Sequence, residues 1–264
     1  MASCPTPAAV VRSPSPRFVE AELTHLARAP IDLELAHAQH AGYVRLLSRL
    51  GLEVLWLPPL PAHPDGVFVE DTVIVVGDTA VLTRPGALSR RGEVASVGQA
   101  LLARGYRLRS IVAPGAMDGG DVLQVGRTLY VGRTARTDDV AIAQLRALMA
   151  PLDRRVVAVP VTGVLRLKTA ATALPDGTIV AIPGCVAADV FGDREVFAAP
   201  EPAGGDLLVV GEVVVVSAAA PRTAELIRRR GFVIEVVDVS ELEKAEAGVT
   251  CMSVLLGTPV PGAS

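Results

Sequence analysis

The sequence predicts an α/β fold in which one structural unit is repeated five times around a ring. Short apolar segments of strand length alternate with amphipathic helical segments along the whole chain. A polar start, a hairpin, a helix and a return strand recur about every 40 to 50 residues, a spacing typical of internal repeats. The starts lie near Asp71, Asp121, Lys168, Asp206 and Cys251. We therefore expect residues 1–264 to form one domain, closed by pairing the C-terminal strand with the N-terminal one.

The elements of the first half are bounded by glycines. The helical segment 31–50 has one broad apolar face and is followed directly by Gly51, the residue type preferred just after a helix. Gly77 lies between two apolar strands and indicates a hairpin. Helices are expected at 31–50 and 91–104, and strands at 8–12, 53–57, 72–76 and 80–84.

The second half repeats this order. The turns of its three hairpins are Gly126-Arg127, Pro175-Asp176-Gly177 and Gly211-Glu212, combinations that favour tight turns. Strands are expected at 121–125, 128–131, 155–159, 167–174, 178–182, 207–210, 213–217 and 233–237, and helices at 138–149 and 222–230. The last module is a short apolar strand with Cys251 at its start.

The composition excludes several classes of protein. A net charge of -3 argues against nucleic acid as the main partner, and an aromatic content of 3% leaves few platforms for stacking bases. No apolar run is long enough to span a bilayer, and no basic run suggests a membrane surface. The first five residues lack the features of a signal peptide, so we expect a cytoplasmic location.

The cysteines and histidines show no metal or disulfide pattern. The three cysteines, Cys4, Cys185 and Cys251, are far apart, and the four histidines lack metal-ligand spacing. We expect neither a metal nor a cofactor. Cys251 is the informative one, because a thiol at a strand end can be aimed at a substrate. Taken alone, its simpler explanation is a small buried apolar residue.

Carboxylates are concentrated in two short segments. Asp65, Glu70 and Asp71 precede an apolar strand, and Asp118 and Asp121 flank a pair of glycines. Several carboxylates together are costly unless they face solvent or a cation. A solvated loop and a plain tight turn are the simpler explanations for each segment alone.

Basic residues lie near both acidic segments. Arg90 and Arg91 follow the first hairpin, and Arg133 and Arg136 follow the second. Arginine can bind a carboxylate with two parallel hydrogen bonds, although each alone could be an ordinary surface residue. Carboxylates, arginines and a thiol together indicate a zwitterionic ligand with an extra cationic group, such as an arginine derivative.

Six ordered segments resemble those of dimethylarginine dimethylaminohydrolases, which belong to the guanidino-group-modifying pentein superfamily. The segments are DGVFVED at 65–71, TRPGALSRRGE at 83–93, MDGGD at 117–121, GRTART at 132–137, VLRLK at 164–168 and VTCMS at 249–253. They run in order through nearly the whole chain. The resemblance implies a five-bladed α/β propeller of ββαβ modules, in agreement with the repeat pattern.

The resemblance also implies roles for individual residues. Cys251 would be the nucleophile that attacks the guanidinium carbon, forming a covalent thiouronium that water converts to citrulline after dimethylamine leaves. The other implied roles are guanidinium binding by Asp71 and Asp118, carboxylate binding by Arg90 and Arg136, and a mobile lid that contains Leu23. Asp65 and Glu70 would flank the site and either bind the substrate amino group or orient neighbouring residues. The partner implied is a small guanidino compound; a homodimer is compatible with the apolar helix faces.

One position departs from the family. Arg166, in the segment expected to be a strand at 164–168, stands where the family carries a catalytic histidine. Arginine stays protonated at any working pH, so it is no general base and a poor general acid. We predict weak or absent dimethylargininase activity. His63, Glu70 and Asp118 are the groups that could substitute. The alternatives are a silent relative that binds an arginine-like ligand or a partner, and a hydrolase of a different substrate.

Overall fold

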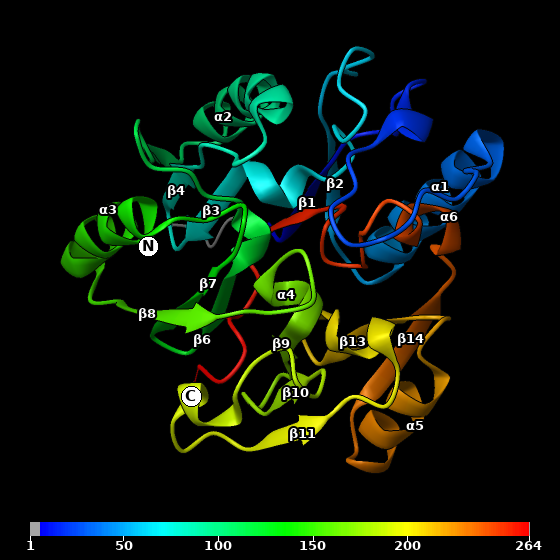
Figure 1. The fold of residues 1–264 in the computed structure, drawn as a ribbon, viewed down its shortest axis with the longest axis vertical. Coiled ribbons are helices and arrows are strands. Elements are labelled where there is room, and N and C mark those ends of the chain that lie inside the picture. The colour runs from blue at the N-terminus through cyan, green and yellow to red at the C-terminus, as the bar shows by residue number, and fades with distance from the viewer. Residues whose placement is uncertain (1–5, 264) are drawn as a thin grey trace.

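Five three-stranded sheets surround a central axis in the computed structural model, which describes residues 6–263 (Figure 1). The sheets are β15-β1-β2, β3-β4-β5, β6-β7-β8, β11-β10-β9 and β12-β13-β14. The strands are β1 Ala8–Val11, β2 Glu53–Trp56, β3 Val73–Val76, β4 Thr79–Leu82, β5 Arg107–Ser110, β6 Val122–Val125, β7 Thr128–Arg133, β8 Arg155–Pro160, β9 Ala171–Ala173, β10 Ile179–Ala181, β11 Val196–Ala198, β12 Leu208–Val210, β13 Val213–Ser217, β14 Val233–Val237 and β15 Val254–Leu256. The predicted five-bladed α/β propeller, the pentein fold, is confirmed.

Each blade combines an antiparallel pair with a parallel third strand. In the second blade, β4 pairs antiparallel with β3 and parallel with β5. The ring closes as predicted, because β1 pairs antiparallel with β15, with Ala9 opposite Leu255, and parallel with β2. The two ends of the chain thus share one blade. Cys4 and the other residues at 1–5 lie outside the described residues.

The four longer helices lie on the outside of the ring, whereas α4 lies near its centre (Figure 1). The longer ones are α1 Leu33–Arg49, α2 Val94–Ala103, α3 Asp139–Met149 and α5 Pro221–Arg229, and the short ones are α4 Leu167–Ala170 and α6 Ser240–Glu243. Buried apolar side chains fill the space between four of the sheets and their long helices, as Leu47 and Leu101 do in the first two blades. No helix within residues 6–263 is long and apolar enough to cross a membrane.

Three local predictions were wrong. The segment expected to be a strand at 164–168 is a bend that leads into α4, and residues 167–174 contain α4 before the strand β9. Cys251 lies on a turn, three residues before β15 begins. The strands β5 and β11 were not predicted, because β5 is a largely exposed stretch without apolar alternation and β11 has only three residues.

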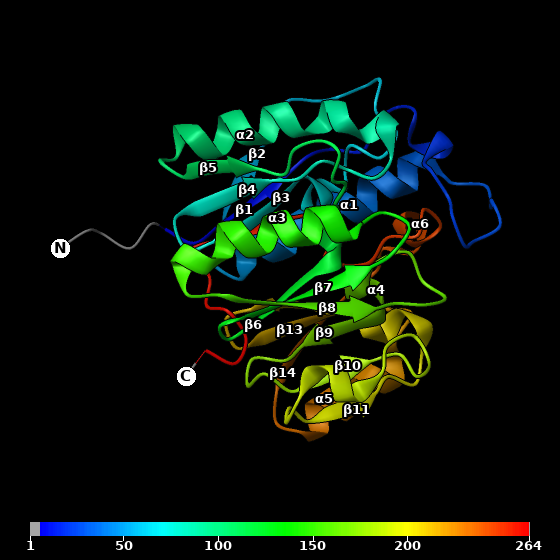
Figure 2. The same ribbon diagram turned by 60° about the vertical axis from the view of Figure 1, so that its left-hand side comes forward.

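The two ends of the ring differ in what lies on them. Figure 2 shows the segment around residues 20–30, together with α4 and α6, at one end, and the C-terminal segment at the other. Each of these segments lines one of two cavities near the axis, described below.

Candidate active site

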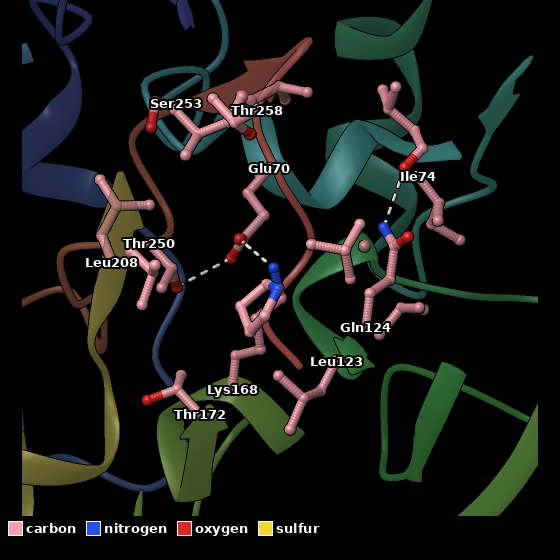
Figure 3. Close-up of a pocket in the computed structure, with 18 of the residues that line it drawn as sticks. Glu70, Ile74, Leu123, Gln124, Lys168, Thr172, Leu208, Thr250, Ser253 and Thr258 are labelled. Carbon is pink, nitrogen blue, oxygen red and sulfur yellow. Dashed lines mark hydrogen bonds and ion pairs between the residues drawn. The ribbon is translucent and has the colours of Figure 1, made fainter. Parts of the chain in front are cut away.

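The starts of the repeated units meet on the propeller axis. The Lys168 ammonium forms a buried ion pair with Glu70, whose second oxygen lies 3.0 Å from the Thr250 hydroxyl (Figure 3). That hydroxyl is 3.3 Å from Asp206 Oδ2, and the Thr250 N–H donates to Asp206 Oδ1 at 2.9 Å. Residues from four blades therefore meet at residues 248–252, the segment that carries the nucleophile candidate Cys251 and is named the nucleophile turn.

Cys251 is buried, with 2% of its surface exposed. The Gly248 N–H lies 3.5 Å from its Sγ, and its carbonyl oxygen accepts from the Glu70 N–H at 3.2 Å. Burial raises the pKa of the thiol, and the carboxylates of Asp206 and Glu70 raise it further. Arg166 acts in the opposite direction, as the sequence suggested, but these effects outweigh it. The resting thiol is therefore protonated at neutral pH.

Arg166 points toward the two carboxylates expected to hold a guanidinium. Its Nη2 lies 2.7 Å from Asp71 Oδ2, and its Nε lies 3.1 Å from Asp118 Oδ2. All three side chains are almost completely buried. Burial alone would raise the pKa of Asp71, but Arg166 and Arg90 hold it below the usual range. The pKa of Asp118 is raised by burial and then by Asp71.

Arg90 is buried in a network of its own. Its guanidinium pairs with Asp71 and with Glu93, at 2.7 Å from Glu93 Oε2, and it donates to the carbonyl oxygens of Asp65 and Phe68. Only 2% of Arg90 is exposed. In this arrangement the Arg90 guanidinium holds the Asp71 carboxylate in place. Binding of a substrate carboxylate by Arg90 stays a prediction.

Arg136 and Asp65 contact the segment that contains Leu23. Arg136 Nη1 lies 3.0 Å from Glu22 Oε2, and its Nη2 lies 3.3 Å from Thr24 Oγ1. Asp65 accepts from the Glu22 N–H at 3.2 Å. Leu23 itself is half-buried. The structure therefore places Arg136 and Asp65 each against the segment 22–24, and the role of this segment as a lid stays a prediction.

Glu246 ties this segment to the nucleophile turn, and sequence reasoning missed it. Its carboxylate accepts three successive backbone N–H groups, from Thr24, His25 and Leu26. Glu246 adopts a left-handed backbone with φ 57°, uncommon for a residue other than glycine. Its position five residues before Cys251, in a turn-capable stretch, is the only sequence signal that could have found it.

Asp206 was recognised only as the start of a repeated unit, and Asp121 was assigned to a carboxylate segment without a role in the site. Asp121 Oδ1 accepts the Leu167 N–H at 2.9 Å and so fixes the chain beside Arg166. Burial raises the pKa of both carboxyls to about 7. His63, by contrast, packs its ring against Gly92, with Nδ1 3.0 Å from the Ser89 carbonyl oxygen.

Two cavities flank these residues. One, of about 430 Å³, lies beside the nucleophile turn and is lined by residues that include Leu26, Val164, Asp206 and Gly248. The other, of about 240 Å³, is lined by the polar group in Figure 3, Glu70, Lys168 and Thr250, and by the C-terminal segment 257–261. Among the described residues, no group of three or more His, Cys, Asp or Glu side chains could hold a metal ion.

The fold and the buried thiol among carboxylates define a member of the pentein superfamily. No protein-family model matches the chain. The chain is 45% identical to N(G),N(G)-dimethylarginine dimethylaminohydrolase of Streptomyces coelicolor over 254 residues, which are 96% of this chain and 98% of that protein. It is 34% identical to the enzyme of the same name from Pseudomonas aeruginosa, covering 92% and 97% of the two chains. The chain belongs to the dimethylarginine dimethylaminohydrolase family.

Solved structures agree with this assignment. A cysteine-to-serine variant of the Pseudomonas aeruginosa enzyme, complexed with citrulline, superposes with a TM-score of 0.90 at 33% identity, over 95% of this chain and 99% of that one. A histidine-to-glycine variant of a dimethylarginine dimethylaminohydrolase, solved as an adduct with S-methyl-L-thiocitrulline, gives the same TM-score and identity. The match covers 95% of this chain and 100% of that one.

Proposed function

We propose that the protein is a cysteine-dependent hydrolase of methylated arginines and that Arg166 keeps its turnover low. One observation carries the proposal: the thiol of Cys251 is buried in a site where two carboxylates, Asp71 and Asp118, bind a guanidinium, that of Arg166. Family membership supports the same chemistry, because the Streptomyces coelicolor and Pseudomonas aeruginosa relatives are named for the hydrolysis of dimethylarginine.

The proposed reaction has two stages. The Cys251 thiolate forms a bond to the guanidinium carbon, and dimethylamine leaves with the electrons of the broken C–N bond and a proton. Water then attacks the resulting thiouronium, which releases citrulline and restores the thiol. A bound guanidinium would favour the thiolate, because an opposite charge stabilises it. Each stage needs a group that can donate or accept a proton.

Arg166 is the reason to expect slow turnover. Its carboxylate partners raise its pKa further, so it neither releases a proton to the leaving amine nor takes one from water. General acid-base catalysis typically contributes about a hundredfold to ten-thousandfold in rate. Of the groups considered from sequence, His63 is engaged with Ser89, and Asp118 is held by Arg166. Glu70 is paired with Lys168, whereas Asp206 accepts hydrogen bonds from Thr250, the residue before Cys251, and has a pKa of about 7, which suits proton transfer.

A second function is favoured by the same contacts. Because Arg166 pairs with Asp71 and Asp118 and cannot transfer a proton, the chain could bind an arginine-like ligand, through contacts other than these, or a partner, without turnover. The histidine-to-glycine variant of a dimethylarginine dimethylaminohydrolase nevertheless forms an adduct with S-methyl-L-thiocitrulline. That adduct supports covalent chemistry at a site of this kind without the histidine, and favours the hydrolase.

The test is citrulline formation from dimethylarginine by the wild type, by Arg166→His and by Cys251→Ser. We expect little activity in the wild type, a gain of at least about a hundredfold in Arg166→His, and none in Cys251→Ser. An ordinary enzymatic rate in the wild type would refute the role of Arg166. If neither the wild type nor Arg166→His forms citrulline, but both still bind dimethylarginine in calorimetry, the silent relative would be favoured.

A further inference from the structure

The Arg166 guanidinium makes the contacts expected of a substrate guanidinium. It donates through Nη2 to Asp71 and through Nε to Asp118, so one planar fork bridges the two carboxylates. Guanidinium groups recognise carboxylates in this way because their N–H donors are fixed in a plane. The two aspartates are also those to which the family resemblance assigns the substrate guanidinium.

These carboxylates have no unused oxygen. Asp71 Oδ1 accepts from the Gly120 N–H at 3.2 Å, and its Oδ2 accepts from both Arg90 and Arg166. Asp118 Oδ1 accepts from the Gly86 N–H at 3.0 Å, and its Oδ2 accepts from Arg166. A second guanidinium could therefore bind here only by displacing Arg166, whose like charge would also repel it in this buried place.

The surroundings of Arg166 are shaped to hold it. A Cβ atom on Gly120 would lie 2.5 Å from Arg166 Cδ, so only glycine leaves room for the side chain. Asp121 accepts the Leu167 N–H and fixes the backbone directly after Arg166. With 4% of its surface exposed, Arg166 is as enclosed as the carboxylates it binds.

We infer that Arg166 is an internal ligand of the guanidinium subsite and thereby determines its specificity. While Arg166 is in place, the subsite excludes a cationic guanidino group, so a substrate guanidinium binds only when Arg166 is displaced, which is compatible with the low turnover proposed above. Removing the side chain opens the subsite to guanidinium. This inference rests on the proposed function for the location of the subsite, and it concerns which ligand the subsite accepts.

Two probes of nearly equal shape test the inference through Cys251. Chloroacetamidine is cationic and chloroacetamide is neutral; with either, the thiolate forms a C–S bond to the methylene carbon and chloride leaves with its electron pair. Peptide mass spectrometry gives both alkylation rates at Cys251. Cys185, a partly exposed free thiol on the same chain, corrects for the intrinsic reactivity of the probes.

The wild type should show no preference for the cationic probe relative to Cys185. In Arg166→Ala, or in Arg166→Gln if that variant is the better folded, the cationic-to-neutral ratio at Cys251 should rise roughly 10- to 100-fold, the effect of one hydrogen bond to a charged group. An unchanged ratio would overturn the inference and leave the proposed function intact.

A measurement independent of the thiol separates the two ideas. In a Cys251→Ser background, millimolar methylguanidinium should raise the melting temperature when Arg166→Ala is added, and should leave the parent unchanged. Absence of this shift refutes the internal ligand. Failure of both probes to modify Cys251 in any variant refutes the proposed nucleophile instead.

Discussion

Replacing Arg166 by methionine should destabilise the fold in a pH-dependent way. The substitution keeps an unbranched stem but removes the guanidinium that pairs with Asp71 and Asp118. Breaking a buried ion pair typically costs about 3–5 kcal/mol. We expect about 3 kcal/mol at pH 8, because Asp71 keeps Arg90 as a partner while Asp118 keeps only the Gly86 N–H.

The sign of the pH effect follows from Asp118. Its pKa in the folded protein already lies above the value of 3.8 for an unfolded chain, and loss of Arg166 raises it further. A raised carboxyl pKa contributes stability at low pH that is lost as the pH rises through the folded pKa. The penalty of Arg166→Met should therefore be smaller at pH 5 than at pH 8.

The assay is equilibrium unfolding in urea at both pH values, since guanidinium salts would supply the missing cation. Adding Asp118→Asn to Arg166→Met should recover about 1–2 kcal/mol at pH 8, because no unpaired charge is then buried. A loss below about 1 kcal/mol at pH 8, or no recovery by Asp118→Asn, would refute the view that these ion pairs are formed and matter for stability.

Two further predictions concern the nucleophile turn. Asp206 has a pKa of about 7 in the folded protein and 3.8 in the unfolded chain, so the stability that it contributes below pH 4 should fall by up to about 4 kcal/mol as the pH rises to 7. Asp206→Asn should flatten this part of the pH profile of the free energy of unfolding, measured in urea. An unchanged profile would contradict the raised pKa of Asp206. Gly248→Ala would place a Cβ atom 2.2 Å from Asp206 Cγ, so it should cost about 1–3 kcal/mol and slow alkylation of Cys251. Gly42→Ala in α1, where the nearest atom is 3.7 Å away, is the matched control and should be neutral or stabilising; equal behaviour of the two variants would show that the turn tolerates the clash.

The architecture was predictable because its signals are local. Apolar periodicity marked the helices, and turn residues such as Gly77 and Gly126 marked the hairpins. Strands without such a pattern were missed: β5 is mostly exposed and carries two arginines among its four residues. Regular repetition then allowed the ring to be inferred, including the pairing of β1 with β15.

The site was predictable as a set of residues but less so as a geometry. Cys251, Asp71 and Asp118 could be selected by motif, whereas the direction of Arg166 could not. Its pairing with Asp118 joins residues 48 positions apart in different blades. Arg90 likewise could be an ordinary surface residue or a ligand of the substrate carboxylate by sequence. Its burial depends on how Glu93 and two carbonyl groups pack around it.

The sequence by itself determined the repeated units, their closure into a propeller and the nucleophile candidate, and it placed Arg166 where the family resemblance implies a histidine. Only the tertiary structure decided that Arg166 turns inward onto Asp71 and Asp118. The physical reason is that chain-local hydrophobic periodicity specifies elements, while the partner of a buried charge is set by whichever opposite charge the packed blades bring within hydrogen-bonding distance.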